Sequence, residues 1–137
     1  MPELKKYKMF INGEWVNSDT KKTFETLNPE NNKPWAVVPE ASASDVDRAV
    51  KAAQNAFEGE WPKLLPKERA RYLRMIGDKL RDNAEHLGKI ETIDTGKLYR
   101  ETYKQANYIA EYYDYYAGLA DKVEGSCLLY TSDAADD

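Results

Sequence analysis

The spacing of apolar residues changes once along this chain, and that change constrains the fold more than any other feature. Residues 8–38 carry the short alternating pattern of strands, in which every second side chain faces the same way. After Ser44 the apolar residues instead recur every three or four positions, as on one face of a helix. The sequence therefore predicts a small strand-rich beginning followed by a long helical part.

A tight hairpin is predicted in the strand-rich part. Residues 8–11 and 14–16 flank Asn12-Gly13, a pair that favours a two-residue turn because both turn positions need positive φ. Two further strands are predicted at residues 23–27 and 34–38, on either side of an Asn- and Pro-rich turn. Together these segments predict a small twisted sheet.

Three long helices are predicted at about residues 45–58, 66–95 and 98–121. Ser44 and Asp47 form a variant of the capping box at the start of the first helix. Its apolar residues share one face: Val46, Ala49, Val50, Ala53 and Phe57. Pro66 suits the first turn of the second helix, Asn83 can cap its continuation, and Gly96 is a C-terminal stop. The third helix carries seven of the ten tyrosines.

Composition excludes several classes of protein. With one cysteine the chain has neither an internal disulfide nor a zinc site, and 20 basic residues scattered among 24 acidic ones form no patch for nucleic acid. No apolar run approaches the roughly 18 residues of a membrane span, and residues 1–9 are too charged for a signal peptide. We therefore expect a cytoplasmic protein with neither nucleic acid nor membrane as a partner.

The sequence contains no motif for catalysis or cofactor binding. It has no Gly-x-Gly pair and no Gly-Lys-Ser/Thr, so the usual dinucleotide and phosphate loops are missing. His86 lies among polar residues of a predicted helix and is interpreted as a surface side chain. A tyrosine stripe at helical spacing is typical of packing, with an aromatic substrate passage as the alternative.

Residues 127–137, CLLYTSDAADD, have neither a helical nor a strand period. One codon choice for them matches the transposon-end adapter of sequencing libraries. We therefore interpret residues 1–126 as the natural part and residues 127–137 as a non-native tail. Cys127, in that tail, has no basic neighbour to make it a thiolate.

Particular strings of the natural part resemble the beginning of the aldehyde dehydrogenase superfamily. They follow one another in the usual order and spacing of that family: residues 10–15 (FINGEW), 24–29 (FETLNP), 45–53 (DVDRAVKAA), 66–69 (PKER), 91–97 (ETIDTGK) and 115–122 (YYAGLADK). Each string alone is weak, but the six stand in register and are spread over essentially all of residues 1–126. The chain is thus identified as similar to the N-terminal fragment of such an enzyme.

The resemblance implies an α/β, Rossmann-like parent fold and the oxidation of an aldehyde to a carboxylic acid with NAD or NADP. In this family a cysteine thiolate attacks the aldehyde to form a thiohemiacetal, and hydride then passes to the nicotinamide. The catalytic and cofactor-binding residues of the family lie beyond Ser126, so the chain alone is expected to be inactive. The complete relatives are homodimers or homotetramers.

Two sites carry over from the family residue by residue. A structural K⁺ or Na⁺ is expected between the segment Thr26-Leu27 and Asp94, since a hard cation prefers carboxylate and carbonyl oxygens. Tyr108 is expected beside the passage through which the aldehyde enters, with Tyr112 or Ile109 as the alternatives. The alternative to an enzyme fragment is a non-enzymatic helical interaction module, whose exposed Tyr and Leu faces would bind a partner.

Overall fold

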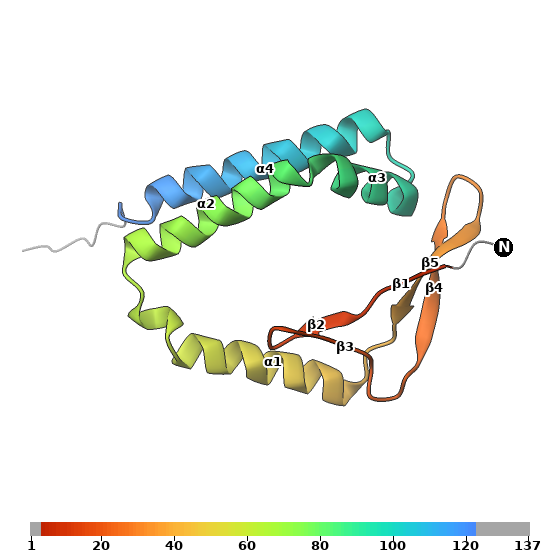
Figure 1. Cartoon of the computed structure of the whole chain (residues 1–137), viewed down its shortest axis with the longest axis horizontal. Helices are drawn as coiled ribbons and strands as arrows, with labels where there is room; N and C mark the ends of the chain where they lie inside the picture. The colour runs from red at the N-terminus through yellow and green to blue at the C-terminus, as the bar shows by residue number, and fades with distance from the viewer. Residues whose placement is uncertain (1–3, 123–137) are drawn as a thin grey trace, which may run out of the picture.

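The structure of the chain, a computed structural model, describes residues 4–122 and contains short strands followed by helices (Figure 1). The elements are β1 (Lys5–Lys6), β2 (Met9–Ile11), β3 (Glu14–Val16), β4 (Thr23–Asn28), β5 (Lys33–Pro39), α1 (Ala43–Glu58), a 3-10 turn η1 (Trp61–Lys63), α2 (Pro66–Asp82), α3 (Ala84–Thr95) and α4 (Tyr99–Leu119). The predicted order of elements is confirmed. The non-native tail proposed at residues 127–137 lies outside the described residues.

The strands form two small sheets. β5 lies between β1, to which it runs parallel, and β4, to which it runs antiparallel. β2 and β3 pair separately as the predicted hairpin, with Asn12 at φ 53° and Gly13 at φ 81° in its turn. β1 was not expected, because two successive lysines show no apolar alternation. Its pairing depends on β5 (Lys33–Pro39), whose partner residues lie 31 positions further along the chain, with Lys5 opposite Ala36 and Lys6 opposite Val37.

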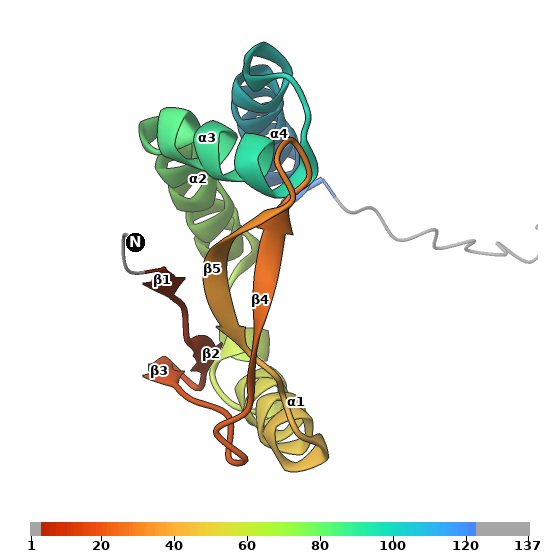
Figure 2. The same cartoon turned by 90° about the vertical axis from the view of Figure 1, so that its right-hand side faces the viewer.

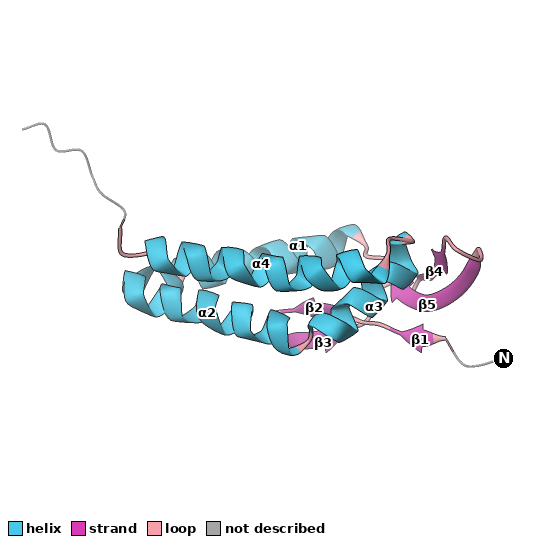
Figure 3. Cartoon of the chain, turned by 90° about the horizontal axis from the view of Figure 1, so that it is seen from above, coloured by secondary structure: helices cyan, strands magenta, loops and turns pink. Residues whose placement is uncertain are grey.

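The elements form an open frame. In Figure 1, α2, α3 and α4 lie along one side, while α1 and the β2–β3 hairpin lie along the opposite side. The β4–β5 pair runs from the α1 side to the α3 end of the helical layer (Figure 2). Seen from above, α2 and α4 lie next to each other and α3 continues from the end of α2 (Figure 3). None of the helices within residues 4–122 is both long and apolar enough to span a membrane.

The helix predicted over residues 66–95 is two helices. The chain breaks at Asn83, where φ is −111° and ψ is 9°, so that α2 ends and α3 begins in a new direction. The Lys79 carbonyl in the last turn of α2 accepts both the side-chain amide of Asn83, at 2.8 Å, and the Asn83 backbone N–H, at 3.2 Å. The helical part therefore has four helices rather than three.

The first helix begins earlier than expected. Its N-cap is Ser42 rather than Ser44, and the reciprocal acid is Asp45 rather than Asp47. Two overlapping capping patterns are present in the sequence, two residues apart, and tertiary contacts select the earlier one. The Asp45 carboxylate also accepts a hydrogen bond from Ser18, 27 residues away, which the later pattern cannot provide.

Small residues bring α4 close to α2 and α3. The buried positions of these helices are Ala70, Gly77, Ala84, Gly88, Thr102, Ala106, Ala110 and Ala117. At the α3–α4 crossing the Thr102 hydroxyl donates to the Gly88 carbonyl at 2.9 Å. A Cβ atom at Gly88 would lie only 3.0 Å from the Tyr103 Cα, so the crossing needs glycine there.

Large apolar side chains remain uncovered within residues 4–122. The buried hydrophobic residues in this range are all alanines. The predicted apolar face of α1 is exposed along its whole length, with Val50 at 63% and Phe57 at 66%. Since a domain core normally buries Leu, Ile, Val and Phe, these faces lack a covering layer in the part of the chain described.

The α3–α4 crossing makes a prediction about stability. Gly88→Ala is expected to lower the free energy of unfolding by about 1–3 kcal/mol, because the new methyl group meets the Tyr103 backbone. Gly118→Ala is the matched control on α4, since a Cβ there meets no atom within 4 Å. That variant should be neutral or more stable by up to about 1 kcal/mol. Urea unfolding followed by helical circular dichroism measures both, and equal effects would contradict the close crossing.

Candidate functional site

Asp45 is the most strongly hydrogen-bonded ionisable side chain among residues 4–122. It is 1% exposed, and its Oδ2 accepts from the Ser42 backbone N–H and from the Ser18 hydroxyl, each at 2.8 Å. Arg48 forms an ion pair with Oδ1 at 2.5 Å. The hydrogen bond from the Ser42 backbone N–H is the largest cause that holds the pKa of Asp45 well below its usual value. Hydrogen bonds from the Ser42 and Ser18 hydroxyls and from Arg48 lower this pKa further, whereas burial raises it.

This cluster has a structural rather than a catalytic role: it joins the loop after β3 to the start of α1. Asp19, in the loop before β4, also donates its backbone N–H to Asp45 at 3.2 Å. The carboxylate is therefore saturated with donors and has no access to a substrate. Its effect is to fix the loop after β3 against the first turn of α1.

The predicted cation site lies where β4 meets the end of α3. The Thr26 hydroxyl donates to Asp94 Oδ1 at 2.8 Å, across 68 residues of sequence. Leu27 follows directly in β4, at an irregularity in the strand register between Thr26 and Leu27. The structure thus brings Thr26 and Asp94 together, while Leu27 stays adjacent in the strand and 46% exposed.

The end of α3 is held beside the β4–β5 turn by Gly96. This residue has φ 75°, which ends the helix in the left-handed conformation. A Cβ atom there would lie 3.1 Å from Pro29, so backbone and turn are in close contact. Because α3 ends at Gly96 beside this turn, its last residues lie next to β4, and Asp94 contacts Thr26 there.

The donor set at Thr26 and Asp94 fits a weakly held hard cation. It consists of a carboxylate, a hydroxyl and neighbouring backbone carbonyls, all of them oxygen ligands. Within residues 4–122 there is no group of three or more His, Cys, Asp or Glu side chains able to hold a metal ion.

A cavity of about 350 Å³ next to Thr26 and Asp94 was not foreseen from the sequence. Tyr7 and Trp35 line it, with their rings edge to face at 6.2 Å. The Tyr7 hydroxyl and the Trp35 Nε1 are buried without a hydrogen-bond partner in the described structure. No local pattern marks this pair, because Tyr7 lies in the link between β1 and β2 and Trp35 lies in β5.

Tyr108 belongs to a cluster of aromatic side chains on α4. We call this cluster, together with the acid that lies among its rings, the tyrosine face: Tyr108, Glu111, Tyr112, Tyr115 and Tyr116. The cluster lines a cavity of about 440 Å³. The hydroxyls of Tyr108 and Tyr112 lie 3.0 Å apart, and their rings meet edge to face at 4.9 Å. This hydrogen bond raises the pKa of Tyr112, which keeps the phenol neutral.

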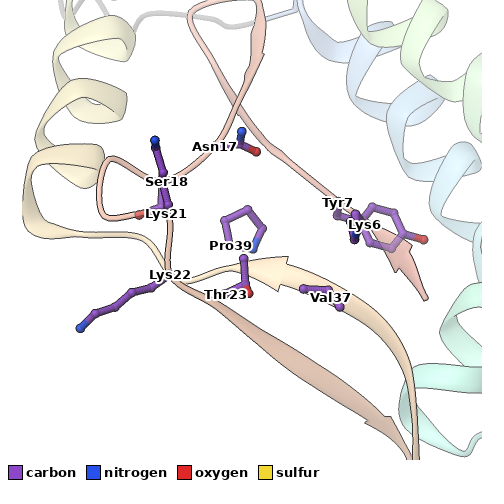
Figure 4. Close-up of a pocket in the computed structure, with 9 residues that line it drawn as sticks. All are labelled: Lys6, Tyr7, Asn17, Ser18, Lys21, Lys22, Thr23, Val37 and Pro39. Atoms are coloured by element: carbon purple, nitrogen blue, oxygen red, sulfur yellow. The ribbon is translucent and has the colours of Figure 1, made fainter. Parts of the chain in front are cut away.

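Another cavity, of about 280 Å³, lies between β5 and the loop before β4 (Figure 4). Val37 and Pro39 line it together with lysines and small polar residues, and no carboxylate, histidine or cysteine lines it. Figure 4 shows the Lys22 side chain extending away from Pro39. The hydroxyl of Ser18, one of the lining residues, is engaged in the hydrogen bond to Asp45.

The remaining residues considered from the sequence have no catalytic surroundings. His86 is exposed on α3, as expected of a surface histidine. Cys127 lies outside the described residues. Within residues 4–122, the functional candidates are therefore the Thr26–Asp94 contact and the tyrosine face.

The chain is similar to a large set of known proteins. Residues 15–135 match the aldehyde dehydrogenase family. The chain is 43% identical over 124 residues to the (Z)-2-((N-methylformamido)methylene)-5-hydroxybutyrolactone dehydrogenase of Acinetobacter baylyi, covering 90% of this chain and 25% of that protein. Identity to aldehyde dehydrogenase 1 of Tanacetum cinerariifolium is 41%, covering 96% and 27%.

Solved structures agree with the sequence matches. The NAD⁺ complex of an aldehyde dehydrogenase from Bacillus cereus superposes with a TM-score of 0.88 at 40% identity, over 94% of this chain and 27% of that one. The chain thus spans about a quarter of the length of the curated relatives it matches. The family match extends into residues 127–137, whose adapter origin stays a prediction.

The Asp45 cluster predicts a pH dependence of stability. The folded chain holds the pKa of Asp45 below its ordinary value of 3.8, so the ionised carboxylate stabilises the fold above that pH and loses this effect as the pH falls below it. Asp45→Asn should lower the melting temperature by several degrees at neutral pH, and the difference from wild type should narrow in acid. Asp47→Asn, an exposed change on the same helix, is the control; a difference that stays constant with pH would contradict the cluster's role.

Proposed function

Because the chain belongs to the aldehyde dehydrogenase family, we propose that it is the N-terminal part of a longer enzyme that oxidises an aldehyde to a carboxylic acid with NAD or NADP. The observation that carries this proposal is the family match over most of the chain, at the same fold as an enzyme solved with NAD⁺. Family membership favours this reading over a non-enzymatic helical interaction module.

The residues of this chain support the enzyme without performing its chemistry. No Gly-rich dinucleotide turn occurs in the sequence, so the cofactor, which accepts the hydride, is held by residues outside this chain. The hydroxyl–carboxylate contacts described above, Ser18–Asp45 and Thr26–Asp94, belong to the buried cluster at the start of α1 and to the proposed cation site. We propose that this part is a scaffold that wraps the cofactor-binding domain.

The uncovered apolar surface supports a longer parent chain. The exposed face of α1 carries Val46, Val50 and Phe57, and the β2–β3 hairpin exposes Phe10 and Trp15. Such contiguous apolar faces are normally covered by other parts of a protein. The rest of the enzyme is the covering layer we propose, and a homodimer or homotetramer is the assembly that the resemblance favours. The cytoplasm as its location stays a prediction.

The contact between Thr26 and Asp94 supports a structural cation site. One carboxylate oxygen of Asp94 accepts the Thr26 hydroxyl, which leaves the other oxygen for a cation. The carbonyls of Thr26 and Leu27 are the further ligands we propose, with K⁺ or Na⁺ as the ion. Such a site would hold the end of α3 against β4 in the complete enzyme.

Tyr108 is the residue we propose beside the aldehyde passage. Its ring is 56% exposed in the described part of the chain, and so it is available to a ligand. It also lines the largest of the cavities described above. An aromatic wall suits the apolar body of an aldehyde substrate.

The enzymatic function is tested with the complete gene product. That protein should produce NADH or NADPH when given an aldehyde, and the released acid should accumulate in equal amount. The 137-residue chain, assayed beside it, should give no turnover, because it lacks the nucleophile and the dinucleotide turn. A complete product that oxidises no aldehyde would contradict the proposal, as would turnover by the short chain alone.

The cation site makes a separate prediction. K⁺ or Na⁺ should raise the melting temperature of the complete enzyme by several degrees over a Tris buffer of equal ionic strength, and Asp94→Ala should abolish that increase. Thr26→Val, which keeps the carboxylate, should weaken the salt response without removing it. Asp47→Ala removes an exposed carboxylate elsewhere and serves as the control. An unaltered salt response in Asp94→Ala would count against the site.

A further inference from the structure

Asp94 is the only charged side chain among the described residues that line the cavity between β4 and α3. The other lining residues, among them Tyr7 and Trp35, are uncharged. The Thr26 hydroxyl donates to Asp94 Oδ1 at 2.8 Å, and no lysine, arginine or histidine within residues 4–122 forms an ion pair with this carboxylate. Asp94 therefore brings one uncompensated negative charge to the proposed cation site.

A lysine that could neutralise Asp94 lies three residues further along the chain, at Lys97. Its Nζ instead forms an ion pair with Glu91 Oε1, at 2.8 Å. Glu91 and Asp94 are three residues apart on α3, so their side chains are neighbours on the helix surface. The four-carbon stem of a lysine is flexible enough to reach either carboxylate. Glu91 is the one that binds the ammonium, and Asp94 keeps its charge.

The end of α3 directs Lys97 back toward Glu91. Gly96 turns the chain with φ 75°, and Thr95 then connects the residues on either side of this turn. The Thr95 hydroxyl donates to the Glu91 carbonyl at 2.6 Å and accepts the Lys97 backbone N–H at 3.4 Å. These contacts all lie within residues 91–97, so they do not depend on which faces of the chain are covered in a longer protein. The Glu91–Lys97 ion pair is therefore a local feature of this helix end.

This ion pair determines the net charge next to the cavity. Glu91, Asp94 and Lys97 together carry one negative charge, and it stays on Asp94 because Lys97 neutralises Glu91. Without the Glu91 carboxylate, the ammonium of Lys97 is free to pair with Asp94 and to compete with a bound cation. Without the Lys97 ammonium, two carboxylates on neighbouring helix positions attract a cation more strongly. The two losses therefore change the affinity for a cation in opposite directions.

We propose that the Glu91–Lys97 ion pair sets the charge of the cation site, so that Asp94 alone faces the ion and a monovalent cation is favoured over a divalent one. The inference rests on the proposed function, because it takes a cation to bind beside Thr26 and Asp94. Divalent ions such as Ca²⁺ are held by several carboxylates, whereas a single one suits a weakly bound monovalent ion. Glu91 and Lys97 are positioning residues in this arrangement, since neither lines the cavity and both act through the charge on Asp94.

The half-saturating ion concentration tests this proposal. The melting temperature of the complete enzyme is followed against KCl and, separately, NaCl, with Tris chloride keeping the ionic strength constant. Glu91→Gln should raise the half-saturating concentration roughly 2- to 5-fold, the range of a surface ion pair, because Lys97 then pairs with Asp94. Lys97→Met should lower it by a similar factor. The double variant Glu91→Gln/Lys97→Met restores one negative charge and should return close to wild type.

A divalent ion and a matched control complete the experiment. Coulomb energy scales with the charge of the ion, so Lys97→Met should lower the half-saturating concentration of CaCl₂ by a larger factor than that of KCl. Glu85→Gln is the control, because it removes a similar ion pair, with Lys89, near the other end of α3. It should leave the half-saturating concentrations unchanged. A merely structural ion pair would lower the melting temperature of its variants without moving these concentrations.

Failure of this inference is distinguishable from failure of the proposed cation site. A wild-type salt response that Asp94→Ala abolishes, but that neither Glu91→Gln nor Lys97→Met shifts, would overturn the inference and leave the site intact. Shifts in the same direction in both single variants would also overturn it, because charge does not then account for them. A wild type that responds to neither K⁺ nor Na⁺ would overturn the site and the inference together, while aldehyde oxidation tests the enzyme assignment separately.

Discussion

The close approach of α4 to α2 and α3 is the constraint on which the rest of this structure depends. Backbones come near each other only where side chains are small, and the Gly88–Thr102 contact shows how little space is left. Once alanine, glycine and threonine occupy the inner positions, the large side chains of α4 must lie on its other faces. The exposed tyrosines are therefore a consequence of how the helices pack.

Two polar contacts connect helices to the strand-rich part, one at α1 and one at α3. Asp45 holds the loop after β3 to the start of α1, and Asp94 holds the end of α3 to β4. Both carboxylates accept a hydroxyl hydrogen bond from a residue far away in the sequence, so they act over long loops where apolar contact is sparse. Many large apolar side chains of this frame stay exposed among residues 4–122. We propose that the rest of a longer enzyme covers them, since the chain spans about a quarter of the length of its curated relatives.

The described residues indicate which parts of such an enzyme this chain contains. This part contains neither the nucleophile nor the cofactor loop, yet its longest helix presents aromatic rings and an acid on one surface. These side chains are exposed in the part of the chain described.

Local patterns in the sequence determined the hairpin at Asn12-Gly13, the positions of the longer strands and the extent of the helical part, because turn chemistry and apolar periodicity act between near neighbours. The six short sequence strings shared with aldehyde dehydrogenases identified the family. Tertiary structure alone decided that α1 starts at Ser42, that β1 pairs with β5, and that the tyrosines face outward. It also decided the break at Asn83, where α3 leaves α2 to cross α4. These features depend on contacts between distant residues, whose energies no local pattern records.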